Sequence, residues 1–244
     1  MRISGQTDQG RVRTENQDSF GKYIFGEYTL CVVCDGMGGA AGGKTASSMA
    51  CSEFMKSVAE KLEKIDSKDE CERVLQEGVM AANGAVYSKA QSDKELSGMG
   101  TTLCAILTDE KKVWAVSVGD SRIYMFKELK AHQISHDHSY VQALVDSGTI
   151  TKEESRSHPN KNIITRAIGT APEIYCDSFV MEFDADGFLL CSDGLSNYFT
   201  EDELYCFFSQ YSKDENALAG ALIQQANLAG GADNITALVI INDK

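Results

Sequence analysis

The sequence predicts an α+β fold in which antiparallel β-sheets are covered by helices. Apolar runs of strand length are separated by short turns, such as residues 109–111, and runs joined this closely pair as antiparallel hairpins. Segments with helical periodicity gather toward the two ends of the chain, so strands and helices do not alternate as they do around a parallel sheet. The 244 residues contain no Pro/Ser-rich linker, composition break or internal repeat. We therefore expect one domain over residues 1–244, with no regulatory tail.

The individual elements follow from two periodicities. Strands are expected at 28–34, 101–108, 113–118, 122–126, 174–183, 188–191 and 235–241. A helix is expected at 45–65, where apolar residues recur every four positions, and a second helix at 70–91. Three more helices are predicted to begin at capping boxes, in which a hydroxyl group and a glutamate three residues later satisfy free backbone N–H groups. These pairs are Thr151 with Glu154, Thr200 with Glu203, and Ser212 with Glu215.

Charge and composition limit the classes of function. The net charge of −13 at pH 7 disfavours binding to nucleic acid or to anionic membrane surfaces. No apolar stretch of about eighteen residues is present and no apolar segment follows the N-terminus, so we expect a soluble, cytoplasmic protein. Six of the eight cysteines lie in regularly patterned apolar segments, which favours buried free thiols. Within a strand, Cys31 and Cys34 would point to opposite faces, which disfavours a zinc or redox site there.

Four aspartates, Asp35, Asp120, Asp193 and Asp233, lie at the ends of apolar strands. One Asp–Gly pair after a strand is ordinary turn chemistry, but four strand ends converging at one rim of a sheet would form a cluster of negative charge. Such a cluster stays ionised only when cations are bound. Oxygen ligands suit Mg²⁺ and Mn²⁺, and no Cys/His set competes for zinc. The pattern predicts a divalent, multinuclear cation site.

The N-terminal segment adds Arg13 and Asp18, five residues apart in a stretch too polar to be core. An arginine binds phosphate through its planar guanidinium group, and a nearby carboxylate can hold a metal ion or its water. The same pair is equally compatible with a solvated turn that contains a salt bridge.

A set of short segments occurs in a distinctive order along the chain. They are RTENQD at 13–18, VVCDGMGG at 32–39 followed by AS at 46–47, GMGTT at 98–102, VGDSR at 118–122, ISHDHS at 134–139, ITRAIG at 164–169, LLCSDGL at 189–195 and GADNIT at 231–236. Over essentially the whole chain, the set resembles the metal-dependent protein phosphatase family (PPM, type 2C) in its compact bacterial form. The resemblance implies a four-layer α/β/β/α sandwich, with two antiparallel sheets flanked by helix pairs and the metal site at one end between the sheets.

The resemblance also implies a ligand set for two Mn²⁺ or Mg²⁺ ions. By position, Asp35 bridges the two ions and the carbonyl oxygen of Gly36 binds one of them. Asp193 and Asp233 hold the other ion.

Further roles are implied around these two ions. Asp18 would act through a metal-bound water, and Asp120 with Asp193 matches the third, weaker metal position of the family. Arg13 matches the family's phosphate-binding arginine. Residues 136–168 correspond to a flap beside the site that influences substrate choice.

The implied activity is that of a serine/threonine protein phosphatase. The two ions lower the pKa of a shared water, which attacks phosphorus in line without a phosphoenzyme. No arginine stands six residues after any cysteine, which excludes the cysteine-nucleophile phosphatases. Phosphorylated proteins are the expected substrates, with a cognate serine/threonine kinase as the functional counterpart and a monomer as the expected state.

Two positions depart from the family pattern. Gln17 stands where many relatives have glutamate, which removes one charge that organises water but keeps a hydrogen bond. Met37 stands where some eukaryotic members have a histidine thought to protonate the leaving group, so the general acid is unassigned.

Three other interpretations fit some of the residues. Gly38–Thr45 satisfies the P-loop pattern G-x-x-x-x-G-K-[ST] between a strand and a helix, which would indicate a nucleoside triphosphatase. A non-catalytic binding module with the same fold is a second alternative, although none of the metal aspartates is missing. The group His136-Asp137-His138 could bind a metal ion, but hydrogen bonding at the start of a helix is the favoured role.

Overall fold

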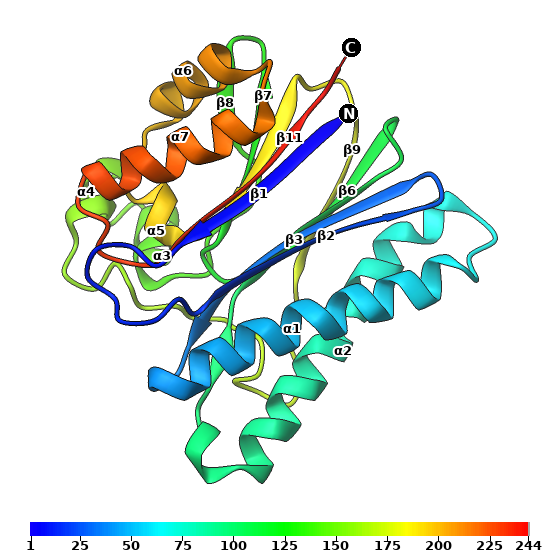
Figure 1. The fold of residues 1–244 in the computed structure, drawn as a ribbon. Helices are drawn as coiled ribbons and strands as arrows, with labels where there is room; N and C mark the ends of the chain where they lie inside the picture. Colours follow the sequence, from blue (N-terminus) through cyan, green and yellow to red (C-terminus); the bar gives the residue numbers. More distant parts are fainter. Residues whose placement is uncertain (244) are drawn as a thin grey trace.

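Two antiparallel β-sheets packed face to face form the centre of the molecule (Figure 1). The structure is a computed structural model that describes residues 1–243. The first sheet has the order β1 (Arg2–Asp8), β11 (Ile235–Ile241), β10 (Gly187–Cys191), β7 (Arg122–Lys127) and β8 (Lys130–Gln133). The second has the order β2 (Asp18–Phe25), β3 (Tyr28–Met37), β5 (Leu103–Thr108), β6 (Lys112–Val118) and β9 (Asp177–Glu182), and β4 (Gly100–Thr101) pairs with β3. Lys244, the last residue of the predicted domain, lies outside the described residues.

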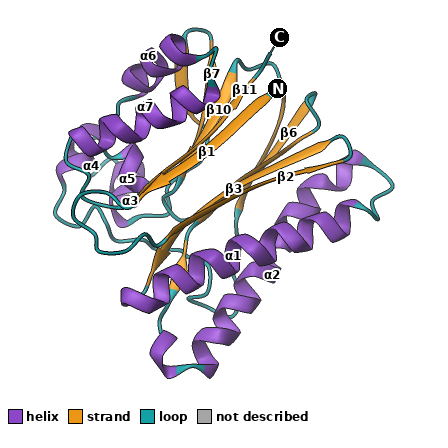
Figure 2. Cartoon of the chain, viewed as in Figure 1, coloured by secondary structure: helices purple, strands orange, loops and turns teal. Residues whose placement is uncertain are grey.

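Helices cover the outer faces of both sheets (Figure 2). The helices α1 (Gly39–Leu62) and α2 (Cys71–Ser92) lie on the second sheet, and α6 (Glu201–Tyr211) and α7 (Glu215–Leu228) lie on the first. Three short helices are α3 (Tyr140–Asp146), α4 (Lys152–Ser157) and α5 (Asp193–Ser196), and single 3₁₀ turns occur at Lys68–Glu70 and Lys94–Leu96. The predicted α/β/β/α sandwich is confirmed.

Alternating side chains on the strands build three apolar layers. On β3, Leu30 and Val32 pack toward α1 and α2, whereas Cys31 and Val33 pack between the two sheets. A third cluster joins the first sheet to α6 and α7. Cys34 belongs to the helix side of β3, so Cys31 and Cys34 lie on opposite faces as predicted.

The expected strands are present, but their bounds differ from the prediction where hydrogen bonds to distant residues determine where a strand begins or is interrupted. Thr102 interrupts the expected strand 101–108, because its N–H bonds the carbonyl oxygen of Asp35 at 2.8 Å. The strand expected from residue 174 begins at Asp177. Three strands, β1, β2 and β8, lie outside the predicted set, because each is a sheet edge whose sequence lacks a long apolar run.

Two of the three predicted capping boxes are confirmed, those of Thr151 and Thr200. The prediction at Ser212 is wrong. The N-cap of α7 is Asp214, whose carboxylate accepts hydrogen bonds from the N–H groups of Asn216 and Ala217. Ser212 instead ends α6 in a helical conformation. A carboxylate that serves two N–H groups therefore places the helix start two residues later.

Every cysteine in residues 1–243 is a free thiol. Most are buried, as predicted, but Cys176 is half-buried and Cys206 is exposed on α6. Cys206 therefore corrects the expectation of burial, because the apolar face of α6 is carried by Leu204 and Phe208. No helix within residues 1–243 is long and apolar enough to span a membrane.

The fold excludes the P-loop interpretation of Gly38–Thr45. A P-loop holds its phosphates in a glycine-rich loop before the helix, whereas α1 already begins at Gly39. The ammonium group of Lys44 donates to the carbonyl oxygen of Asp18 at 3.0 Å. The neighbours of β3 are also antiparallel to it, without the crossover helices that a P-loop sheet requires.

Candidate active site

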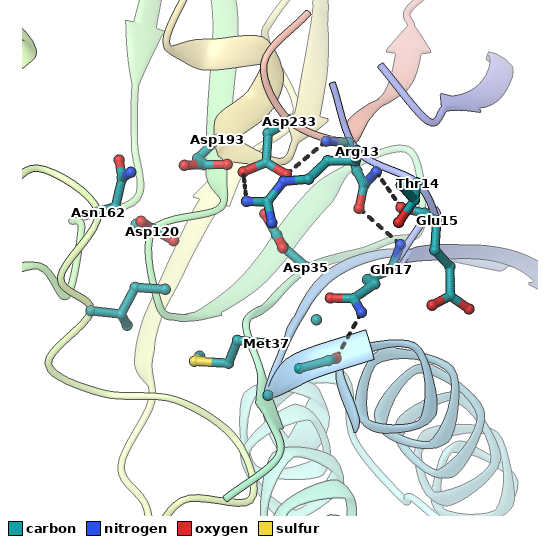
Figure 3. Close-up of a pocket in the computed structure, with 15 residues that line it drawn as sticks. Arg13, Thr14, Glu15, Gln17, Asp35, Met37, Asp120, Asn162, Asp193 and Asp233 are labelled. Carbon is teal, nitrogen blue, oxygen red and sulfur yellow. Dashed lines mark hydrogen bonds and ion pairs between the residues drawn. The ribbon is translucent and has the colours of Figure 1, made fainter. Parts of the chain in front are cut away.

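One cavity gathers most of the predicted site residues. Its volume is about 450 Å³, and it lies where strand ends from both sheets meet (Figure 3). Asp35 comes from the end of β3, Asp120 from the turn after β6, Asp193 from the start of α5, and Asp233 from the residues before β11. Arg13 and Gly36 also line it. Four separate strand ends therefore bring their carboxyl groups to one place, as the pattern predicted.

Asp18 lies behind the cavity wall instead of lining it. It is only 1% exposed, although residues 11–15 of the same polar segment are exposed as expected. It pairs with Asp35 in the register of β2 and β3. One carboxylate oxygen accepts hydrogen bonds from the hydroxyl groups of Ser192 (2.7 Å) and Thr236 (2.6 Å). The other oxygen, Oδ1, is buried and has no hydrogen-bond partner.

The close approach of these carboxyl groups opposes their ionisation. Burial, followed by the charge of Asp18, raises the pKa of Asp35 well above its ordinary value. Burial and the charge of Asp193 raise the pKa of Asp120 in the same way. Burial and then the Asp233 carboxylate raise the pKa of Asp193. Carboxyl groups with these shifts favour protonation or the binding of a cation.

The donor set fits hard divalent cations, provided that carbonyl groups and water complete the coordination. Among the described residues no group of three or more His, Cys, Asp or Glu side chains is arranged to hold a metal ion by itself. The aspartates and backbone carbonyl groups of the lining nevertheless offer oxygen ligands, and behind the cavity wall Oδ1 of Asp18 is a buried acceptor without a hydrogen-bond partner. Mg²⁺ and Mn²⁺ accept such a mixed set, and Mg²⁺ usually keeps several waters.

Glycine is required where β3 approaches the start of α1. A Cβ atom on Gly36 would lie 2.1 Å from the carbonyl oxygen of Gly43 and 2.7 Å from that of Gln17. Only a residue without a side chain can therefore place its backbone here beside Asp35.

Arg13 lines the cavity and pairs with Asp233, whose Oδ2 is 2.7 Å from Nη2 of the guanidinium group (Figure 3). The Arg13 side chain remains 54% exposed. An exposed guanidinium beside the carboxyl groups can turn toward an incoming anion.

The residues that support the site were missed by the sequence reasoning. The buried amide of Asn234 accepts from the N–H of Gln17 and donates to the carbonyl oxygens of Gln9 and Glu15, so it fixes the loop that carries Arg13. Thr102 accepts the N–H of Asp35 at 2.8 Å. Asn234 follows Asp233 directly in the segment GADNIT, and this position in the sequence was the signal that could have identified it.

The two positions that depart from the family pattern both line the cavity. The Gln17 side chain donates to the carbonyl oxygen of Gly39 at 2.8 Å, so it ties the N-terminal loop to the start of α1. Met37 lies across the cavity from Arg13 (Figure 3) and offers no proton donor.

Comparisons with known proteins agree on one family. Residues 7–224 match the model of protein phosphatase 2C. The serine/threonine phosphatase stp of Listeria monocytogenes serotype 4b is 36% identical over 248 residues, covering 100% of this chain and 96% of that protein. The serine/threonine protein phosphatase PstP of Mycobacterium tuberculosis is 35% identical over 240 residues, covering 98% of this chain and 44% of that longer protein.

Solved structures give the same result. The serine/threonine phosphatase Stp1 from Staphylococcus aureus has a TM-score of 0.91 and 33% identity, covering 99% of this chain and 95% of that one. The catalytic domain of PstP, solved in complex with two manganese ions, has a TM-score of 0.83 and 32% identity, covering 99% and 98% of the two chains. With the fold, the aspartate-lined cavity and these full-length similarities in agreement, the chain belongs to the protein phosphatase 2C family.

Proposed function

We propose that this chain hydrolyses phosphoserine and phosphothreonine in proteins at the cavity lined by Asp35, Asp120, Asp193 and Asp233. Family membership makes it a serine/threonine phosphatase that acts on phosphorylated proteins. The observation that carries the site assignment is the convergence of four strand-end carboxyl groups and one exposed arginine on a single cavity.

The residues divide into those that would hold cations and those that would bind the phosphoryl group. Asp35 would serve both of two Mn²⁺ or Mg²⁺ ions. The carbonyl oxygen of Gly36 would bind one of them, and Asp193 with Asp233 would hold the other. When bound, such ions lower the pKa of water and screen the charge on the phosphoryl oxygens. Asp18 lies behind the cavity wall, and its unpartnered carboxylate oxygen would accept a hydrogen bond from a water molecule of the cation site.

Arg13 would exchange its partner when substrate binds. In the free protein its guanidinium pairs with Asp233 at 2.7 Å. A phosphoryl dianion offers two or three oxygens in the geometry that a guanidinium fork matches, and a cation at Asp233 would remove that carboxylate as a competitor. The arginine would then hold the phosphoryl group in line with the attacking water.

Several wider assignments belong to the same proposal. A third cation would lie at Asp120 and Asp193, and residues 136–168 would act as a flap, because Asn162 and Ile164 line the cavity beside Asp120. The protein would act as a single-domain monomer in the cytoplasm. A serine/threonine kinase of the same cell would supply its substrates.

The first test is hydrolysis by metal-stripped protein of para-nitrophenyl phosphate and of a phosphothreonine peptide, with and without Mn²⁺. We expect turnover to appear only with Mn²⁺ and to fall at least a hundredfold in Asp193→Ala, because the variant removes a carboxylate from the cation site. The matched control is Asp66→Asn, which changes an exposed carboxylate in the loop after α1. Folded wild-type protein without turnover under any metal would overturn the proposal in favour of a binding module.

A further inference from the structure

His138 connects the base of the flap to the turn that carries Asp120. It is 7% exposed and stands just before α3. Its Nδ1 accepts a hydrogen bond from the N–H of Gly119 at 3.1 Å, and its backbone N–H donates to the carbonyl oxygen of Gly119 at 2.9 Å. One residue therefore satisfies both backbone polar groups of Gly119, the neighbour of Asp120.

The turn at Gly119 has little freedom of its own. Gly119 has a φ of +99°, and a Cβ atom there would lie 2.6 Å from the side chain of Thr102. Since the turn is buried, no water can replace a lost partner of the Gly119 N–H without rearrangement. The direction of Asp120 therefore depends on the bonds that His138 makes.

The backbone of His138 also joins the beginning and the end of the flap, residues 136–168. The carbonyl oxygen of His138 accepts the N–H of Thr165 at 2.8 Å, and the next residues form a bridge between Ser139 and Ile164. Ile164 lines the cavity, and Figure 3 shows Asn162, two residues earlier, on the Asp120 side of it. The start and the end of the flap thus meet at the residue that holds Gly119.

The imidazole has a hydrogen-bond donor close to each ring nitrogen, the N–H of Gly119 at Nδ1 and Nη1 of Arg166 at Nε2, and a neutral ring can accept from only one of them. We assign the accepted hydrogen bond to Gly119, because Nη1 of Arg166, 3.0 Å from Nε2, has two other acceptors: Oδ1 of Asp177 at 3.2 Å and the carbonyl oxygen of Tyr175 at 3.3 Å. Because Nδ1 accepts from Gly119, the ring proton must be on Nε2, which lies 3.3 Å from Oδ1 of Asp177. Burial and the Arg166 charge lower the pKa of His138, which keeps the ring neutral.

We propose that His138, as a neutral Nε2–H imidazole, is a positioning residue that fixes Asp120 through Gly119 and couples the position of the flap to the cation affinity of the Asp120 side of the cavity. This inference rests on the proposed function of the cavity. The acceptor atom at the position of Nδ1 is the feature that matters, and the positive charge of a protonated histidine has no part in it.

The tautomer can be tested in the wild-type protein without any activity. A long-range ¹H–¹⁵N correlation spectrum of ¹⁵N-labelled protein distinguishes a ring protonated at Nε2 from one protonated at Nδ1. We expect His138 to carry its proton on Nε2 from pH 6 to 8. A ring protonated at Nδ1 would overturn the proposal, because that ring cannot accept from Gly119.

Three variants then separate positioning from general packing. His138→Asn keeps an acceptor oxygen near the position of Nδ1, whereas His138→Leu removes it. The control is His132→Leu, at an exposed position of β8. Mn²⁺ binding by calorimetry and hydrogen exchange of the Gly119 amide are the readouts. For the leucine variant at 138 we expect affinity for the weakest-binding Mn²⁺ to fall about tenfold and amide exchange to quicken, with the asparagine variant within about threefold of wild type.

These outcomes test the positioning role of His138 separately from the proposed phosphatase function. Equal losses in the leucine and asparagine variants at 138, or no loss in either, would overturn the positioning role. If the leucine variant fails to fold, the tautomer and the Gly119 exchange rate in the asparagine variant still decide. Absence of phosphatase activity in the wild type would instead count against the proposed function, whatever the tautomer.

Discussion

Asp18 shows what a single buried carboxyl group costs the protein when no cation is bound. Burial raises its pKa from an ordinary value of 3.8 to about 7, although hydrogen bonds from Thr236 and Ser192 act in the opposite direction. Between about pH 4 and 7, the Asp18 carboxyl group is therefore protonated in the folded chain and ionised in the unfolded chain. By linkage, this part of the stability is complete below the unfolded pKa and disappears as the pH rises through the folded pKa.

The resulting prediction concerns metal-stripped protein. Its unfolding temperature should fall by several degrees between pH 5 and pH 8, since the pKa values of Asp35 and Asp120 are shifted in the same direction. Asp18→Asn should flatten part of this dependence, because an amide does not titrate. Calorimetric scans of both proteins in EDTA measure it. A metal-stripped protein that becomes more stable over this range would contradict the assigned burial of these groups.

At the scale of elements, the approach of β3 to the start of α1 gives a second prediction. Gly36→Ala should cost about 2 kcal/mol or more of the free energy of unfolding, because the new Cβ atom would meet the backbone oxygens of Gly43 and Gln17. Gly84→Ala is the matched control: this exposed glycine lies in α2, and no atom lies within 4 Å of the place that an alanine methyl group would take. It should stabilise the protein by about 0.5–1 kcal/mol.

Urea unfolding of the metal-stripped variants measures both effects without involving the cation site. Equal free energies of unfolding for the Gly36 and Gly84 variants would mean that β3 and α1 can separate at little cost. The close backbone approach beside Asp35 would then need another explanation.

Elements with strong local patterns could be predicted from the sequence, and elements defined by distant partners could not. The strand β11 has an uninterrupted apolar run, and its prediction at 235–241 is confirmed. The strand β1 contains one large apolar side chain, Ile3, and exists because it pairs with β11 from the other end of the chain. The burial of Asp18 depends in the same way on hydroxyl groups from Ser192 and Thr236, far along the chain.

At the scale of the whole molecule, the cavity draws on both sheets. Asp35 ends a strand of the second sheet, whereas Asp193 and Asp233 flank β10 and β11 of the first. Four sequence motifs could predict that these carboxyl groups converge, because each follows or precedes an apolar strand. Which sheet each strand joins could not be predicted, since local periodicity carries no information on long-range pairing, and the family resemblance implied only that the site lies between two sheets.

A cation held between Asp35 and Asp193 would join the two sheets, so Mn²⁺ should stabilise the molecule as a unit. At a hundred times its dissociation constant, a ligand that binds only the folded state adds about 2.7 kcal/mol, which corresponds to roughly 5–10 °C in unfolding temperature for a chain of this size. Hydrogen exchange should slow in both β3 and β11, because opening either sheet would release the ion. Asp35→Asn should remove most of both effects, whereas Asp66→Asn should preserve them. Protection confined to one sheet would show that the cation site belongs to that sheet alone, and the carboxyl groups of the other would then serve only to shape the cavity.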